Sequence, residues 1–246
     1  MSSSRNARQG EPVTAVLFDW DFTLAYSLGL NVSHIARTTK LFQNYGVVCT
    51  VEEVAAAQAS LEADIASGKM TGSLRPQKKS QIIRLYRELL RRLNHPDESY
   101  EFAYEVYAGY GLLPHYLFDD VLPTLQALQS RNLKLGILSN HSSSVRRTIE
   151  QLVDGIIPQA QITISEEVGI HKPGKTIFQR AAHKLQEKPA NCLYVGDNLA
   201  VDAEAAVQSG GYAGGVWIDR YERPFSESLS PYIHRVTNLT QLILLL

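Results

Sequence analysis

Residues 13–23 read VTAVLFDWDFT, an almost wholly apolar run of strand length that is followed at once by Asp19 and Asp21. Such a run is typical of a strand that is covered on both faces, as in a parallel sheet. Similar runs that end at polar residues occur at 133–138, 160–164, 192–195 and 213–218. Helical patterns lie between them, over 118–131, 143–152, 174–185 and 202–209. This alternation predicts an α/β fold with a doubly wound, Rossmann-like parallel sheet.

Residues 26–112 interrupt the alternation and carry only helical patterns. Thr50 to Glu53 have the form of a capping box that opens a helix, and Asp97 is placed to cap a later one. We therefore predict three parts, which are a disordered polar arm at residues 1–12, an α/β body at 13–27 and 112–246, and an all-helical insertion at 28–111.

Charge and cysteine content narrow the class of protein. The chain has 24 Lys and Arg against 25 Asp and Glu among 246 residues. This balance argues against a nucleic-acid or membrane partner, which would require a basic excess. Cys49 and Cys192 are far apart, which excludes a cysteine zinc site or a disulfide framework. With no signal-like or membrane-spanning apolar segment, we expect a cytoplasmic protein.

Two acidic pairs follow predicted strands, Asp19 with Asp21 and Asp197 with Asp202. In doubly wound folds the carboxyl ends of the strands line the ligand crevice, so these four carboxylates are expected to converge there. Such a group needs a cation, and hard oxygen ligands suit Mg²⁺. Each pair alone also has an ordinary structural explanation, an Asx turn for the first pair and helix capping for Asp202.

Two further pairs carry little information when each is taken alone. Ser139-Asn140 follows a strand and precedes a helix, where hydroxyl and backbone N–H groups can hold phosphate oxygens. Lys172-Pro173 offers a cation near the body, although a Lys-Pro pair is ordinarily an exposed loop. The order of these motifs along the chain gives them their weight.

The ordered set DWDFT at 19–23, SN at 139–140, KP at 172–173 and GDNLAVD at 196–202 resembles the haloacid dehalogenase-like hydrolase superfamily. The helical insertion after the first motif is similar to the cap of its phosphoglycolate phosphatase-like members. The resemblance implies that Asp19 is the nucleophile that accepts a phosphoryl group. It implies that Asp21 is first the general acid and then the general base, and that Lys172 neutralises the charge of Asp19 and the phosphoryl group.

The resemblance also implies a Mg²⁺ site and a phosphoryl site. The implied metal ligands are Asp19, the backbone carbonyl of Asp21, Asp197 and, directly or through water, Asp202. The phosphoryl oxygens would be bound by Thr23, Ser139 and the Asn140 amide. Arg75, in a loop of the insertion, is a candidate for contact with substrate.

Asp21 favours a phosphatase or a phosphomutase, because dehalogenase-type and phosphonatase-type members lack this aspartate. Phe22 departs from the family, in which this position is commonly Gly. The resemblance therefore implies a Mg²⁺-dependent phosphatase that hydrolyses a small phosphorylated metabolite, phosphoglycolate-like or a sugar phosphate, through an aspartyl-phosphate. A phosphomutase and a non-catalytic binding or regulatory protein are the alternatives.

Overall fold

The computed structural model describes residues 12–27, 34–72 and 79–246. The chain forms two compact units. The first consists of the chain up to Tyr26 together with Leu117–Asn140 and Ile149–Leu246, and the second consists of Ser27–Tyr116 and His141–Thr148. Apart from Pro12, the arm predicted at residues 1–12 lies outside the described residues, as does Arg75.

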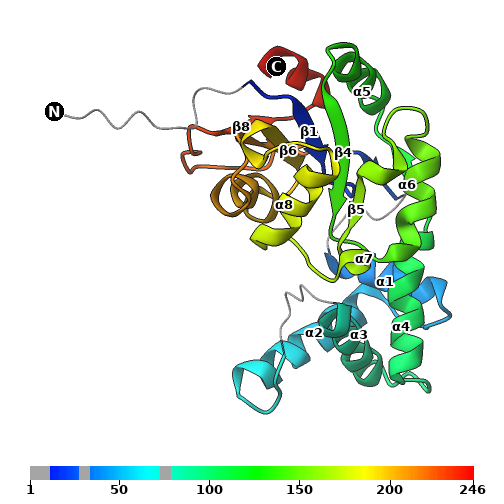
Figure 1. The fold of residues 1–246 in the computed structure, drawn as a ribbon. Helices are drawn as coiled ribbons and strands as arrows, with labels where there is room; N and C mark the ends of the chain where they lie inside the picture. Colours follow the sequence, from blue (N-terminus) through cyan, green and yellow to red (C-terminus); the bar gives the residue numbers. More distant parts are fainter. Residues whose placement is uncertain (1–11, 28–33, 73–78) are drawn as a thin grey trace. The chain divides into compact units, whose positions relative to one another are not determined.

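The first unit is built on a six-stranded sheet with the order β5-β4-β1-β6-β7-β8 (Figure 1). Every pair of neighbouring strands is parallel. The strands are β1 (Ala15–Phe18), β4 (Lys134–Ser139), β5 (Ile162–Ile164), β6 (Cys192–Gly196), β7 (Gly214–Ile218) and β8 (Ile233–Val236). The predicted α/β fold class and its five strands are confirmed. β8 was not predicted, because its sequence IHRV places an exposed His and a partly exposed Arg between two buried residues.

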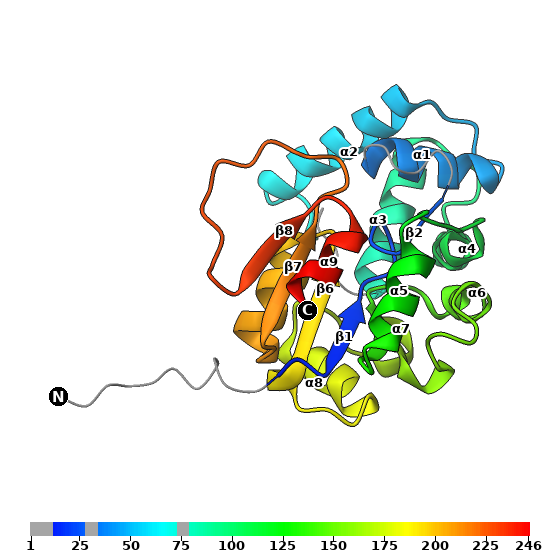
Figure 2. The same ribbon diagram turned by 90° about the horizontal axis from the view of Figure 1, so that it is seen from above.

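Helices cover both faces of this sheet. The α-helices outside the 27–116 segment are α5 (Val121–Ser130), α6 (Arg146–Leu152), α7 (Ser165–Val168), α8 (Lys175–Lys184) and α9 (Leu242–Leu245). Leu17 of β1 and Tyr194 of β6 pack against Phe178 of α8, whereas α5 lies on the opposite face (Figures 1 and 2). Since successive side chains of a strand point to opposite faces, a strand between two layers must be apolar throughout.

The second unit is helical and has a core of its own. Its helices are α1 (His34–Asn44), α2 (Val51–Ala66), α3 (Lys79–Arg92) and α4 (Tyr100–Gly109). Apolar side chains from all four form one buried cluster, which includes Phe42, Leu61, Leu89 and Val106. This cluster allows the unit to bury apolar surface without help from the sheet.

The capping signals were partly right. The capping box of Thr50 and Glu53 is present at the start of α2. The expectation for Asp97 was wrong, because the N-cap of α4 is Ser99, whose hydroxyl accepts the Phe102 N–H. The Asp97 carboxylate instead accepts the N–H of Ser99.

A short two-stranded sheet marks the points where the chain leaves the body and returns to it. It pairs β2 (Ala25–Tyr26) with β3 (Tyr116–Leu117). The segment 141–148, which the sequence placed in the body, clusters with the helical unit, where the Ser144 hydroxyl donates to the Ala108 carbonyl at 2.6 Å. No helix among the described residues has the length and apolar character needed to cross a bilayer.

Candidate active site

Three carboxylates converge at the carboxyl ends of β1 and β6. Asp19 follows β1 directly, and its N–H donates to the Val195 carbonyl at 2.8 Å. Asp197 follows β6, and Asp202 lies in the helical turn beyond it. Each of the three offers an oxygen that lies within 4.8 Å of those of the other two. Parallel strands that end at one edge of the sheet thus bring Asp19 and Asp202 together across 183 positions of sequence, the difference between their residue numbers.

Lys172 neutralises part of this charge from a fully buried position. Its Nζ atom lies 2.9 Å from Asp19 Oδ1 and 2.6 Å from Asp202 Oδ1. The side chain is only 2% exposed, so water contributes little screening to either ion pair. The expectation that a Lys-Pro pair lies in an exposed loop does not hold here.

Tyr194 is a site residue that sequence reasoning missed. Its hydroxyl accepts a hydrogen bond from Lys172 Nζ at 2.9 Å and donates one to the carbonyl of Leu138. The available signal was a tyrosine inside a wholly buried strand, because a buried hydroxyl needs a hydrogen-bond partner. Which partner it finds depends on the position of β6 beside β1 and β4, and the local sequence does not contain this information.

Asn140 holds the Lys172 loop by its side-chain amide. The Asn140 Nδ2 donates to the Lys172 carbonyl at 2.9 Å, and the Lys172 N–H donates to Asn140 Oδ1 at 2.8 Å. The side-chain amide therefore positions Lys172, and the predicted contact of Asn140 with phosphoryl oxygens would use its backbone N–H. Ser139, the last residue of β4, is buried beside it.

The turn after β6 fixes the Asp202 carboxylate. The Asn198 N–H donates to Asp202 Oδ2 at 3.0 Å, and the Asn198 side chain accepts the Val201 N–H at 3.1 Å. With Asn198 as its N-cap, this helical stretch begins at Leu199, three residues earlier than predicted, and it has π-helical geometry over Leu199–Glu204. Asp202 is thereby held with one oxygen toward Lys172.

The loop after β1 is a tight turn closed by backbone hydrogen bonds. The N–H groups of Leu24 and Ala25 both donate to the Trp20 carbonyl, each at 3.0 Å. Phe22 has a φ of +57°, in the left-handed region that favours glycine. This backbone geometry accounts for the glycine that the resemblance implies at this position. Thr23 and Trp20 are both completely buried.

Burial and like charge perturb the acidic group. Burial, with smaller contributions from the nearby Asp202 and Asp21 carboxylates, raises the pKa of Asp19 to about 6 against the opposing effect of Lys172. Burial also places the pKa of Asp197 well above its usual range, again with help from Asp202 and Asp19. Burial alone would lower the pKa of Lys172, but Asp19 and Asp202 raise it above its ordinary value.

This acidic group fits Mg²⁺. Three carboxylates face one ammonium, and buried groups that resist ionisation without further positive charge are what a hard divalent cation would stabilise. Asp19, Asp197 and Asp202 are the side chains that would hold the ion. The expectation that four carboxylates converge was only partly right, because the Asp21 carboxylate is not among the three that lie within 4.8 Å of one another. The resemblance assigns the backbone carbonyl of Asp21 to the metal.

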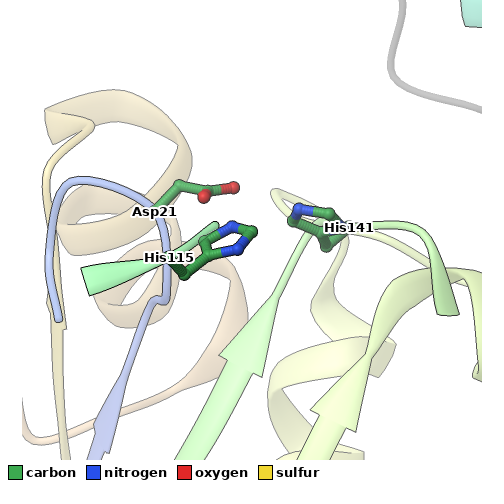
Figure 3. A group of neighbouring side chains, drawn as sticks. All are labelled: Asp21, His115 and His141. Atoms are coloured by element: carbon green, nitrogen blue, oxygen red, sulfur yellow. The ribbon is translucent and has the colours of Figure 1, made fainter. Parts of the chain in front are cut away.

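Two buried histidines lie together in the helical unit. The ring centroids of His115 and His141 are 6.2 Å apart (Figure 3), and Tyr110 stacks on His141 at 4.9 Å. His141 directly follows Asn140 in the chain. The two histidines are separated along the chain, and sequence reasoning did not connect them.

A model of a known protein family covers the segments that form this site. The family model described as haloacid dehalogenase-like hydrolase matches residues 13–210, which include Asp19, Lys172 and Asp202. The chain belongs to this family, and it is therefore a hydrolase of the haloacid dehalogenase-like class.

Two curated relatives are phosphatases. The chain is 32% identical over 205 residues to a glyceraldehyde 3-phosphate phosphatase of Methanopyrus kandleri, a match that covers 80% of this chain and 81% of the relative. It is 30% identical over 164 residues to a phosphoserine phosphatase of Thermus thermophilus, with 65% of this chain and 63% of that protein covered.

Solved structures share the fold at lower identity. The HAD-hydrolase YfnB from Bacillus subtilis bound to magnesium has a TM-score of 0.68 at 19% identity, with 96% of this chain and 99% of that chain covered. A 2-haloacid dehalogenase from Pseudomonas syringae has a TM-score of 0.61 at 21% identity, with coverages of 95% and 98%. At these identities the likeness concerns the fold alone.

Proposed function

We propose that this protein is a Mg²⁺-dependent phosphatase that hydrolyses a small phosphomonoester through an aspartyl-phosphate intermediate. The observation that carries the proposal is the buried Asp19 carboxylate, which is paired with Lys172 at 2.9 Å and grouped with two further carboxylates. An anion can attack the phosphorus of another anion only where positive charge offsets the repulsion, and these residues provide or would bind that charge.

In the first half-reaction, an Asp19 carboxylate oxygen forms a bond to phosphorus while the bond from phosphorus to the leaving oxygen breaks. The Asp21 carboxyl gives its proton to the leaving oxygen, so the product leaves as a neutral alcohol. Lys172 stabilises the charge that gathers around the phosphoryl group. A Mg²⁺ ion held by Asp19, Asp197, Asp202 and the Asp21 carbonyl would add positive charge to the same region.

In the second half-reaction, the Asp21 carboxylate takes a proton from water as the water oxygen bonds to phosphorus. The bond between phosphorus and the Asp19 oxygen breaks, which releases inorganic phosphate and restores the Asp19 carboxylate. Thr23, Ser139 and the Asn140 backbone N–H are assigned to the phosphoryl oxygens. The Asp21 proton that was lost in the first half-reaction is thus recovered in the second.

The substrate we propose is a small phosphorylated metabolite, phosphoglycolate-like or a sugar phosphate. The phosphatase names of the two curated relatives support this class. We assign the predicted insertion, residues 28–111, to a cap that limits substrate size and excludes water, and the α/β unit to the catalytic body. We also propose that the enzyme is cytoplasmic and that it acts without a nucleic-acid partner, as the charge balance of the sequence indicates.

Phosphate release from a panel of small phosphomonoesters, with Mg²⁺ or with EDTA, tests the proposal. We expect Mg²⁺-dependent turnover that Asp19→Asn abolishes. Asp154→Asn, at an exposed aspartate outside the acidic group, is the matched control and should retain full activity. A requirement for a sugar bisphosphate would indicate a phosphomutase. A folded protein that binds Mg²⁺ without any turnover would contradict the proposal and favour a binding role.

A further inference from the structure

Arg220 connects three separate segments of the α/β unit. It follows β7, and its guanidinium forms a two-pronged ion pair with Asp120, both N–O distances being 3.0 Å. Nη2 also donates to the Thr23 carbonyl at 2.7 Å. The guanidinium carbon lies 3.7 Å from the centre of the Phe118 ring. Its planar guanidinium therefore contacts three groups at once, which are the loop of residues 20–25 after β1, Asp120 at the start of α5, and the Phe118 ring.

The partners of Arg220 are themselves anchored. Asp120 Oδ2 accepts the Leu239 N–H at 2.7 Å, and the Phe118 N–H donates to the Leu24 carbonyl at 3.1 Å. The side chains of Arg220 and Asp120 are 9% and 7% exposed, so their ion pair is shielded from water. The Thr23 carbonyl is thus fixed to a rigid and buried support.

The loop that Arg220 holds includes Asp21 and the left-handed Phe22. A residue in this backbone region persists only when its surroundings fix it. The Leu24 and Ala25 N–H groups close the loop from within through Trp20, and Arg220 secures it from outside through Thr23.

We propose that Arg220, supported by Asp120, is a positioning residue that holds the loop of residues 20–25 so that Asp21 can reach the leaving oxygen. The inference rests on the proposed phosphatase function, in which Asp21 is the general acid. It predicts a specific defect, because a loosened loop harms proton donation more than nucleophilic attack by Asp19, which is anchored separately through Val195.

Leaving groups of different basicity make this defect measurable. An alkyl phosphate such as glycerol phosphate releases a basic alkoxide that needs a proton, whereas p-nitrophenyl phosphate releases a stable phenolate that needs little assistance. We expect Arg220→Lys to lower kcat for the alkyl ester on the order of tenfold more than kcat for the aryl ester. Lysine keeps the positive charge beside Asp120 but cannot form the fork.

Arg131→Met is the matched control. Arg131 belongs to the same unit and also donates to a main-chain carbonyl, that of Ile243 at 2.8 Å, but it does not contact the β1 loop. It should leave the ratio of alkyl to aryl kcat unchanged. Asp120→Asn, which removes the charge that orients Arg220, should shift the ratio in the same direction as Arg220→Lys and serves if the lysine variant does not fold.

Amide hydrogen exchange tests the same contact without turnover. The N–H protons of Leu24 and Ala25 should exchange faster in Arg220→Lys and remain protected in Arg131→Met. Unchanged protection, or an equal loss of kcat on both esters by a folded variant, would overturn the positioning role while leaving the phosphatase proposal intact. A wild-type protein inactive on both esters with Mg²⁺ would overturn the phosphatase function and the inference that rests on it.

Discussion

Gly196 lies directly against the carboxylate of Asp202, and no side chain fits between them. A Cβ atom at residue 196 would overlap the Cβ, Cγ and Oδ2 atoms of Asp202. Glycine at the end of β6 is therefore a condition for placing this carboxylate beside Lys172, and the requirement is one of space, since its backbone lies in an ordinary strand.

Gly196→Ala should consequently displace Asp202 and weaken its ion pair with Lys172. We expect a loss of about 1–3 kcal/mol in the free energy of unfolding from overpacking, and a lower affinity for Mg²⁺. Denaturant unfolding and calorimetric titration with Mg²⁺ measure the two effects. Gly72→Ala, where a Cβ would meet only Ile65 at 3.6 Å, is the control. A Gly196→Ala variant that binds Mg²⁺ with wild-type affinity would contradict this explanation.

Stabilisation by Mg²⁺ should depend on pH. Burial raises the pKa of Asp19 from 3.8 to about 6, so the metal-free folded protein binds more protons than the unfolded chain between these values. The contribution of Asp19 to stability therefore falls as pH rises through this window, by about 3 kcal/mol for such a difference. Mg²⁺ should compete with that proton, so it should raise Tm more at pH 7.5 than at pH 5.

Thermal unfolding with and without Mg²⁺ at the two pH values provides the measurement. Asp19→Asn cannot titrate at this position, and its Mg²⁺-induced change in Tm should be smaller and should vary less with pH. A wild-type shift that is equal at both pH values would show that Asp19 is not the proton-binding group.

The Tyr194 hydroxyl should matter for activity beyond its effect on stability. Tyr194→Phe removes one hydrogen bond to Lys172 and one to Leu138. We therefore expect the free energy of unfolding to fall by about 1–2 kcal/mol and kcat to fall clearly. Tyr212→Phe is a close match, because Tyr212 packs in the same aromatic cluster and donates to the Phe178 carbonyl at 2.8 Å.

Unfolding curves and steady-state kinetics of the two phenylalanine variants separate the roles. Both should lose stability, but only Tyr194→Phe should lose activity, because only Tyr194 touches Lys172. Equal kinetic losses in the two variants would indicate that the aromatic cluster matters only as packing.

Phe22→Gly should relieve the left-handed backbone at residue 22. The relief is worth about 1 kcal/mol, and the greater freedom of glycine in the unfolded chain offsets part of it. We expect a free energy of unfolding equal to or slightly above that of the wild type, with activity retained. Gln186 lies away from the site and has a similar φ of +56°. Chemical denaturation of Gln186→Gly should therefore give a similar change in the free energy of unfolding. If only Phe22→Gly abolished activity, the ring itself would have a role in the site.

The apolar runs of the sequence determined the strands, since a strand buried between two layers must be apolar along its length. They also determined where β1 and β6 end, and therefore which aspartates lie at the carboxyl ends of these two strands. The edge strand β8 was not predicted, because its partly exposed sequence has no such apolar run. Asp97 was mistaken for a cap because Ser99, two residues later, offers an equally suitable oxygen.

The tertiary structure alone decided how the site is held together. Lys172 meets Tyr194 and Asp202 across 22 and 30 positions, and Arg220 reaches Thr23 across 197. A motif identifies residue types and local geometry. The partner of a buried ammonium or guanidinium is set by which strands lie side by side, because such groups can be buried only where the fold supplies opposite charge and hydrogen-bond acceptors.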